Sequence, residues 1–110
     1  MTLTEFLLAR IAEDEDRAKR AAFGWGESWS SNTDDGENWS AVYAGVQYLF
    51  GHEDVDLMDY IARHEPARVL AECEAKRQLI ERVGNPNWAG FNILALPYAE
   101  HPDYRPEWRP

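Results

Sequence analysis

The chain has 110 residues, of which 45% are hydrophobic and 28% charged, so it has room for a single folded domain and is not disordered. Its net charge of −9 disfavours direct binding to nucleic acid phosphates. No apolar run approaches the roughly 20 residues of a membrane span, and no basic region precedes the first apolar residues as in a secretory signal. We therefore expect one domain, residues 1–110, in the cytoplasm and without membrane contact.

The negative charge is concentrated in the first part of the sequence. Residues 1–60 carry 13 acidic and 4 basic residues, whereas residues 61–110 carry seven of each. The chain has a single cysteine, Cys73, which excludes an intramolecular disulfide and fits a reducing compartment. Cys73 is expected to be a small buried hydrophobic residue.

An N-terminal helix is predicted from Thr2 to about Gly24. Thr2 and Glu5 have the spacing of a capping box, in which each side chain binds the other residue's backbone N–H. Leu3, Phe6, Leu7 and Ile11 then recur at the spacing of one helical face. Gly24 is a natural end for this helix.

The middle of the chain favours a small antiparallel sheet. Asp35-Gly36 has the composition of a tight hairpin turn between strands that begin near Trp29 and Trp39. Residues 46–50 alternate like a third strand after a break at Ala44-Gly45. The alternative is a single helix over residues 39–50, but β-branched and aromatic residues favour strands.

The second half is predicted to be helical and interrupted at Pro66. One helix is expected to begin near Asp54 and to end before Pro66, because the residue before a proline avoids the helical region. Pro66 suits the first turn of the next helix, which we expect to end at Gly84. A short helix then follows up to Pro97. The remaining tail contains Pro102, Pro106 and Pro110, and its rings are expected to pack on the body of the protein.

These elements predict an α+β fold: an N-terminal helix, a small antiparallel sheet, a proline-broken helical pair and a packed C-terminal tail. The residues expected in the core are Phe6, Leu7, Ile11, Val46, Tyr48, Ile61, Val69, Leu70, Cys73, Ile80, Phe91 and Leu94.

Two motifs, HEPARVLAECEAKR and LALPYAEHPDYRPEW, resemble an uncharacterised family of small proteins from actinobacteria and their phages. The resemblance covers both ends and most of the second half, and leaves residues 25–51 unplaced. The chain departs from the family pattern at Glu65, where the family usually has Asp, a better helix cap. The resemblance implies a bacterial protein, or a phage protein in the host cytoplasm. It implies no activity, because the family has none assigned.

The residues predict no catalytic, cofactor or metal site. The acids and histidine of GHEDVD lack the closely spaced ligand pairs of zinc sites. Cys73 lies on the apolar stripe between two glutamates, which does not favour a reactive thiolate. No phosphate-binding glycine loop or nucleophile elbow is present.

Four residues are candidates for contact with a partner: His64 and Arg68 at the helix junction, and Tyr104 and Trp108 in the tail. For the junction pair a structural role is the alternative, in which His64 caps a helix end and Arg68 pairs with Glu65 or Glu72. The aromatic content and the lack of chemical motifs predict a non-enzymatic accessory protein that binds another protein, with a homodimer as one form. The alternatives are an acidic mimic of nucleic acid that blocks a DNA-binding protein, and an enzyme of unrecognised type.

Overall fold

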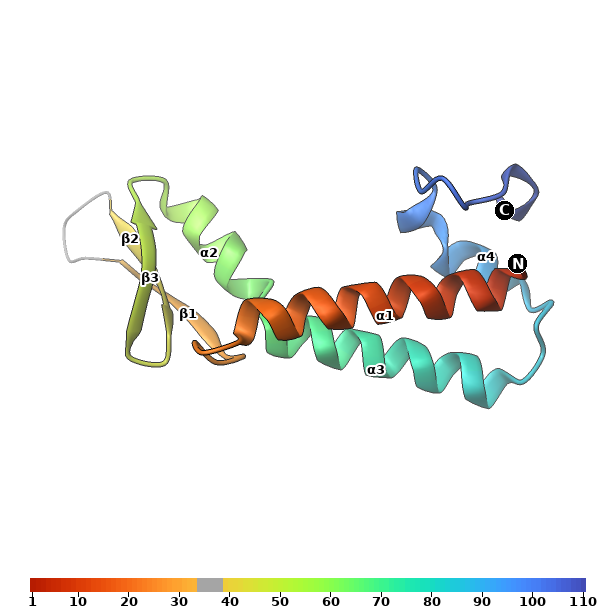
Figure 1. The fold of residues 1–110 in the computed structure, drawn as a ribbon. Coiled ribbons are helices and arrows are strands. Elements are labelled where there is room, and N and C mark those ends of the chain that lie inside the picture. Colours follow the sequence, from red (N-terminus) through yellow and green to blue (C-terminus); the bar gives the residue numbers. More distant parts are fainter. Residues whose placement is uncertain (34–38) are drawn as a thin grey trace. The chain divides into compact units, whose positions relative to one another are not determined.

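A computed structural model describes residues 1–33 and 39–110. The described elements are α1 (Leu3–Ala22), β1 (Trp29–Thr33), β2 (Ser40–Ala44), β3 (Gln47–His52), α2 (Val55–Arg63), α3 (Pro66–Val83) and α4 (Ala89–Leu94), followed by two short 3₁₀ turns, Leu96–Tyr98 and Pro106–Trp108 (Figure 1). This confirms the predicted α+β class. The predicted Asp35-Gly36 turn lies outside the described residues.

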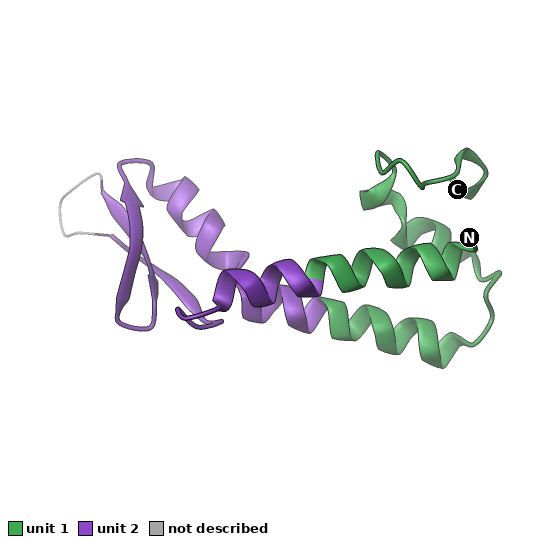
Figure 2. Ribbon diagram, viewed as in Figure 1, with its two compact units in different colours: residues 1–14, 73–110 green, residues 15–72 purple. Residues whose placement is uncertain are grey.

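The chain divides into two compact units (Figure 2). Unit 1 comprises residues 1–14 and 73–110, and unit 2 comprises residues 15–72. The long helices α1 and α3 each contribute residues to both units.

Unit 1 is built around Phe6 of α1. Its core cluster joins Phe6 and Leu7 to Phe91 and Ala95 near α4 and to Trp108 in the tail. The Phe6 ring contacts four rings of the C-terminal segment, at centroid distances from 5.1 Å for Trp108 to 6.4 Å for Tyr98. The tail therefore packs on the protein, as its aromatic content predicted.

The helix boundaries follow from local chemistry. The Glu5 N–H donates to Thr2 Oγ1 at 3.2 Å, and the Thr2 N–H donates to Glu5 Oε1 at 3.0 Å, which confirms the capping box. Asp54 caps α2 by accepting the Leu57 N–H at 2.9 Å. Pro66 is the first residue of α3, where its missing N–H leaves no helical hydrogen bond unmade.

Unit 2 is a three-stranded antiparallel sheet, in the order β1-β2-β3, with α2 packed against one face (Figure 1). Met58 and Ala62 of α2 cover Val42 at the centre of β2. The alternative of one helix over residues 39–50 is wrong. Gly45 forms the turn between β2 and β3 with a φ of +61°, a conformation that side chains disfavour.

Two of the twelve expected core residues are exposed, and Val69 and Leu70 are only half-buried, outside the two core clusters. Val46 is fully exposed in the turn before β3, and the Tyr48 side chain is 48% exposed. The predicted burial of these two side chains is wrong because the pairing of β2 with β3 is irregular. Val42 pairs with Phe50 and Tyr43 with Tyr48, which leaves Leu49 without a partner residue in β2. Leu49 now packs in the core beneath α2, and a change of one position moves a strand's side chains to the opposite face.

A substitution of Trp108 tests whether the tail is part of the core, because this residue is only 9% exposed. We expect Trp108→Ala to lower the free energy of unfolding by about 3–5 kcal/mol, since it leaves a cavity beside Phe6. Urea unfolding followed by circular dichroism measures this. Ile93→Ala, at a side chain that is 61% exposed in the same unit, is the control and should change stability by less than about 0.5 kcal/mol. Equal effects of the two substitutions would show that the tail is not structural.

Candidate interaction face

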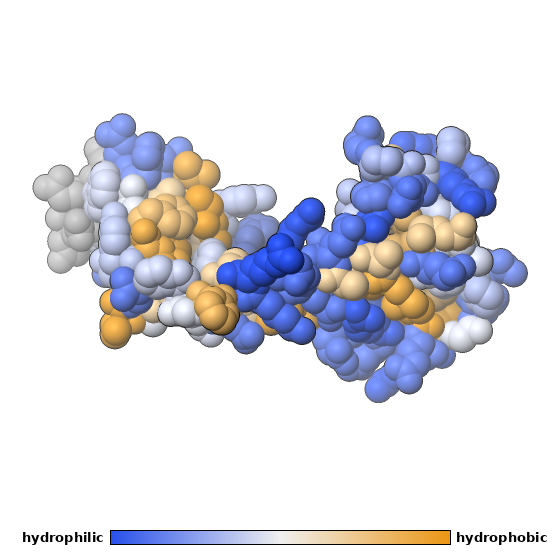
Figure 3. Space-filling view, viewed as in Figure 1, coloured by the Kyte–Doolittle hydropathy of each residue, from blue (hydrophilic) through white to orange (hydrophobic). Residues whose placement is uncertain are grey.

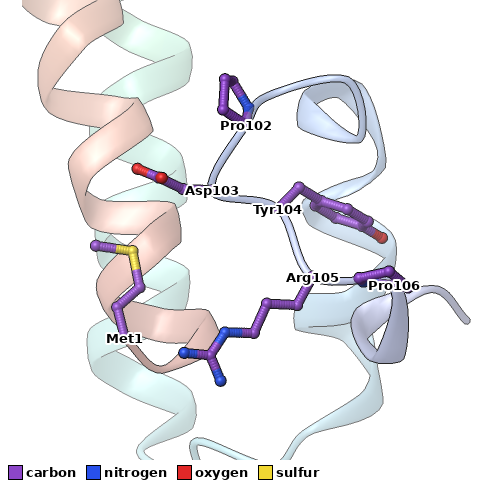
Figure 4. A pocket seen from close by; sticks show the side chains of 6 residues that line it. All are labelled: Met1, Pro102, Asp103, Tyr104, Arg105 and Pro106. Carbon is purple, nitrogen blue, oxygen red and sulfur yellow. The ribbon is translucent and has the colours of Figure 1, made fainter.

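The tail residues expected to meet a partner are instead engaged within unit 1. Trp108 belongs to the core cluster, and Tyr104 packs against it. The Arg105 guanidinium lies over the Trp108 ring at 5.7 Å, and its Nη1 is 4.0 Å from Glu107 Oε1. Tyr104 also lines an open pocket of about 390 Å³ with Met1, Pro102, Asp103, Arg105 and Pro106. Figure 4 shows Asp103 pointing toward α1 and the Tyr104 ring pointing the other way, so the polar groups do not converge on a ligand.

A polar cluster fixes the tail to α1. Arg10, only 7% exposed, places Nη1 at 2.6 and 2.9 Å from the two ring nitrogens of His101, and its Nη2 donates to Glu13 Oε1 at 3.0 Å. The Asp103 N–H donates to His101 Nδ1 at 3.0 Å. Nδ1 is the acceptor in this hydrogen bond. This cluster joins residues 91 positions apart and serves a structural purpose.

A second tether joins Tyr98 to α1. Its hydroxyl donates to Asp14 Oδ2 at 2.7 Å. Burial, together with this hydrogen bond and the charge of Asp14, raises the pKa of Tyr98 well above its usual value. Lys76 Nζ lies 5.7 Å from the centre of the same ring. The tyrosine is thus held in its protonated, hydrogen-bonding form.

At the junction between α2 and α3, both predicted residues have structural partners. His64 Nδ1 lies 2.8 Å from the Tyr60 carbonyl oxygen at the end of α2, and its ring stacks on Tyr60 at 4.3 Å. Arg68 Nε donates to Glu72 Oε1 at 3.0 Å. These contacts match the structural alternative. A role in binding a partner stays a prediction, because both side chains are exposed.

Glu65, which the sequence placed at the junction only as a weak cap, joins the junction to the sheet. Its Oε2 accepts the backbone N–H of Trp29 at 2.7 Å, and the Ala67 N–H donates to the Glu27 carbonyl at 3.0 Å. Asp59 of α2 accepts the Ser31 hydroxyl at 3.3 Å. The start of β1 is therefore fastened to the helices by hydrogen bonds. A polar pocket of about 390 Å³ lies here, lined by Trp29, Ser30, Ser31, Asp59, Ala62, Arg63, Glu65 and Arg68.

The sheet of unit 2 has a second face, opposite α2. Val42 points toward α2, so its neighbours in β2, Ala41 and Tyr43, point away. The Tyr43 ring meets that of Tyr48 edge to face at 5.8 Å. Trp39 lies over Gly51, the cross-strand partner of Ala41, where a Cβ would come within 2.7 Å of Trp39 Cζ2. We call Trp39, Tyr43 and Tyr48 the aromatic face.

The aromatic face is partly open to solvent. Trp39 is 41% exposed, and the fully exposed Val46 lies at the adjoining turn. Figure 3 shows apolar side chains gathered over the part of unit 2 that is in view. Unit 2, to which the face belongs, carries 12 acidic and 5 basic residues in its sequence, a net charge of −7. The sequence contained one signal for this face: residues 29–64 include one short amphipathic helix, which can cover only one side of a sheet.

Cys73 is buried, with Sγ 3.9 Å from the Ile11 carbonyl oxygen, as expected for a small core residue. Within residues 1–33 and 39–110, no group of three or more His, Cys, Asp or Glu side chains is placed to hold a metal ion. No helix in these same residues is long and apolar enough to cross a membrane.

The fold and this surface define a small α+β protein with an aromatic face on an acidic unit. The chain belongs to a family of unknown function, DUF6221, whose model matches residues 1–110. Comparisons with curated proteins and with solved structures gave no match.

The Glu65 contact predicts a local effect on the sheet. Glu65→Ala leaves the Trp29 N–H without its acceptor and should lower the free energy of unfolding by about 1–3 kcal/mol. Amide hydrogen exchange at Trp29 should accelerate at the same time. Glu81→Ala, at an exposed position of α3, is the control and should leave both quantities nearly unchanged. Unaltered exchange at Trp29 in the Glu65 variant would contradict the tether.

The Tyr98 contact predicts a pH dependence. Because the pKa of Tyr98 is raised in the folded protein, unfolded chains ionise this residue first, and its stabilising effect is complete below about pH 10 and lost as the pH rises further. We expect the free energy of unfolding to fall less steeply above about pH 10 in Tyr98→Phe than in the wild type. Asp14→Asn should also reduce the slope, because it removes the charge beside the hydroxyl. Urea unfolding across this pH range measures the slopes, and identical slopes would contradict the tether.

Proposed function

We propose that this protein is a non-enzymatic accessory protein whose aromatic face binds a basic surface of another protein. The observation that carries the proposal is the presence of three aromatic side chains on a partly exposed sheet face within a unit of net charge −7. Tyr and Trp are common anchors of protein interfaces, and arginine stacks well on their rings. Burial of the exposed half of one such ring by a partner contributes about 1 kcal/mol to the free energy of binding.

The charge favours a basic partner over a second copy of the chain. Two copies would each bring a net charge of −9 to the interface and would repel each other. A basic protein is attracted by the same field, which also accelerates its association. A homodimer is therefore the secondary form of the proposal.

The nucleic-acid mimic has less support, because several acids in the first 60 residues, where the excess negative charge lies, have partners within the chain. Glu13 pairs with Arg10, Asp16 with Arg20, and Asp59 with Arg63. Asp14 accepts the Tyr98 hydroxyl, and Asp54 caps α2. Acids that are already engaged within the chain in this way are poorly placed to imitate a continuous row of phosphates.

The proposed setting is the cytoplasm of an actinobacterium, or of the host if the protein is encoded by a phage. Its support is the resemblance of the HEPARVLAECEAKR and LALPYAEHPDYRPEW motifs, which cover the α2–α3 junction and the docked tail. The proposal includes no catalytic step, metal or cofactor.

Binding of synthetic peptides tests the proposal. We expect an oligo-arginine peptide to bind, an oligo-glutamate peptide of equal length not to bind, and the affinity to fall as the ionic strength rises. The double variant Trp39→Ser, Tyr48→Ser should bind the cationic peptide at least about tenfold more weakly, a loss of about 1.4 kcal/mol. Isothermal titration calorimetry measures both quantities.

Ile93→Ser is the matched control, because it removes an exposed apolar side chain from unit 1. It should bind the oligo-arginine peptide as the wild type does. Circular dichroism checks that both variants keep the fold. Equal binding by the wild type and the double variant would overturn the proposed role of the aromatic face.

A further inference from the structure

The sheet of unit 2 has two outer strands, and in the part of the chain that the structure describes, β1 is the one with hydrogen bonds to the helical segments. The Trp29 N–H of β1 is taken by Glu65, and the Ser31 hydroxyl is bonded to Asp59. Among the described residues, no strand pairs with the outer side of β3, since the sheet order is β1-β2-β3. An outer strand leaves alternate backbone N–H and C=O groups unpaired, and these can bind another strand.

The sequence of β3 lacks the usual protection of an open edge. Its six residues, Gln47–His52, contain no lysine, arginine, acid or proline. Charged residues and prolines are the common means by which proteins keep outer strands from pairing. The irregular pairing that passes over Leu49 lies on the inner side, between β3 and β2. The outer side of β3 is thus suited to strand addition.

This edge is continuous with the aromatic face. Tyr48 belongs to β3 itself, and its ring contacts that of Tyr43 on β2. A strand added beside β3 would place every second side chain next to these rings, because strand side chains alternate between the two faces. Long cationic side chains at those positions would lie over aromatic rings, as in cation–π contacts.

The acidic residues near the outer edge of β3 indicate which kind of partner binds there. Glu53 and Asp54 directly follow β3, and Asp56 lies in the first turn of α2. We infer that the partner docks as an extended, cationic segment of another protein, which adds as a fourth strand to the outer edge of β3. This inference rests on the proposed function and specifies how the basic partner binds. Recognition by strand addition combines backbone hydrogen bonds with side-chain selection at alternate positions.

The test uses an alternating Arg-Val peptide of the same length as β3 and two isomers of it, binding to the complete protein. One isomer carries backbone N-methyl groups on its arginines and the other on its valines, so each loses the hydrogen-bond donors of one edge only. We expect the parent peptide to bind and one isomer to bind at least about tenfold more weakly than the other, because strand pairing uses a single edge. A Glu-Val peptide of the same length should not bind.

A measurement on the protein itself complements the peptide isomers. Amide hydrogen exchange in β3 should slow at least about tenfold on binding of the parent peptide, whereas exchange in β1 should change little. Light scattering of the free protein should give the mass of a monomer. A dimer that the Arg-Val peptide does not dissociate would place a second copy at this edge and overturn the inference.

The results of these experiments distinguish a failure of strand addition from a failure of the proposed function. Strand addition is overturned if both isomers bind with equal affinity, and also if neither isomer binds. Suppose that the two isomers bind equally and that the double variant Trp39→Ser, Tyr48→Ser no longer binds the parent peptide. The aromatic face is then still the binding site, and only strand addition is overturned. A parent peptide that does not bind overturns the inference, and oligo-arginine binding then decides separately on the proposed function.

Discussion

The packing of α2 against one face of the sheet is the contact on which unit 2 depends. Met58 and Ala62 bury Val42, and Leu49, Trp29 and Ile61 pack around this centre. A nine-residue helix covers one side of a three-stranded sheet and cannot also cover the other. The hydrogen bonds of Glu65 and Asp59 fasten β1 to the same helical side. The opposite face of the sheet and the outer edge of β3 are therefore not covered by α2. The exposed rings of the aromatic face lie there.

Unit 1 uses its aromatic residues differently. Phe6 stands at the centre of a group of rings supplied by the tail, and Arg10, Asp14 and their partners fix the tail by polar contacts. Tyr104 and Trp108 are thereby used to complete a small core. In a chain of 110 residues the buried fraction of the surface is modest, so a docked aromatic tail adds much of the apolar contact that the unit requires. The same type of residue therefore serves stability in unit 1 and is available for binding in unit 2.

The charge follows the same division. Unit 1 carries 8 acidic and 6 basic residues, a net charge of −2, and several of its acids are bonded to the tail or to α1. Unit 2, which also carries the aromatic face, holds the remaining net charge of −7. In the proposed function, the negative charge of unit 2 attracts a cationic partner over a distance and the exposed rings hold it by contact, so that one unit supplies both attraction and specificity.

The sequence by itself determined the elements and their ends. The Thr2–Glu5 capping box, the Asp54 cap, the Pro66 break and the Gly45 turn depend on interactions within a few residues, and the structure has each of them. Periodicity also identified Phe6, Leu7, Ile11, Cys73 and Phe91 as buried. The candidate site was different: the sequence placed Val46 and Tyr48 in the core and proposed Tyr104 and Trp108 as contacts for a partner. Only the tertiary structure decided these points. Which face of a strand is buried depends on the irregular pairing at Val42 and on where α2 lies, and whether a tail ring is free depends on Phe6, about a hundred positions away. Both depend on contacts between distant residues, which no local pattern in the sequence specifies.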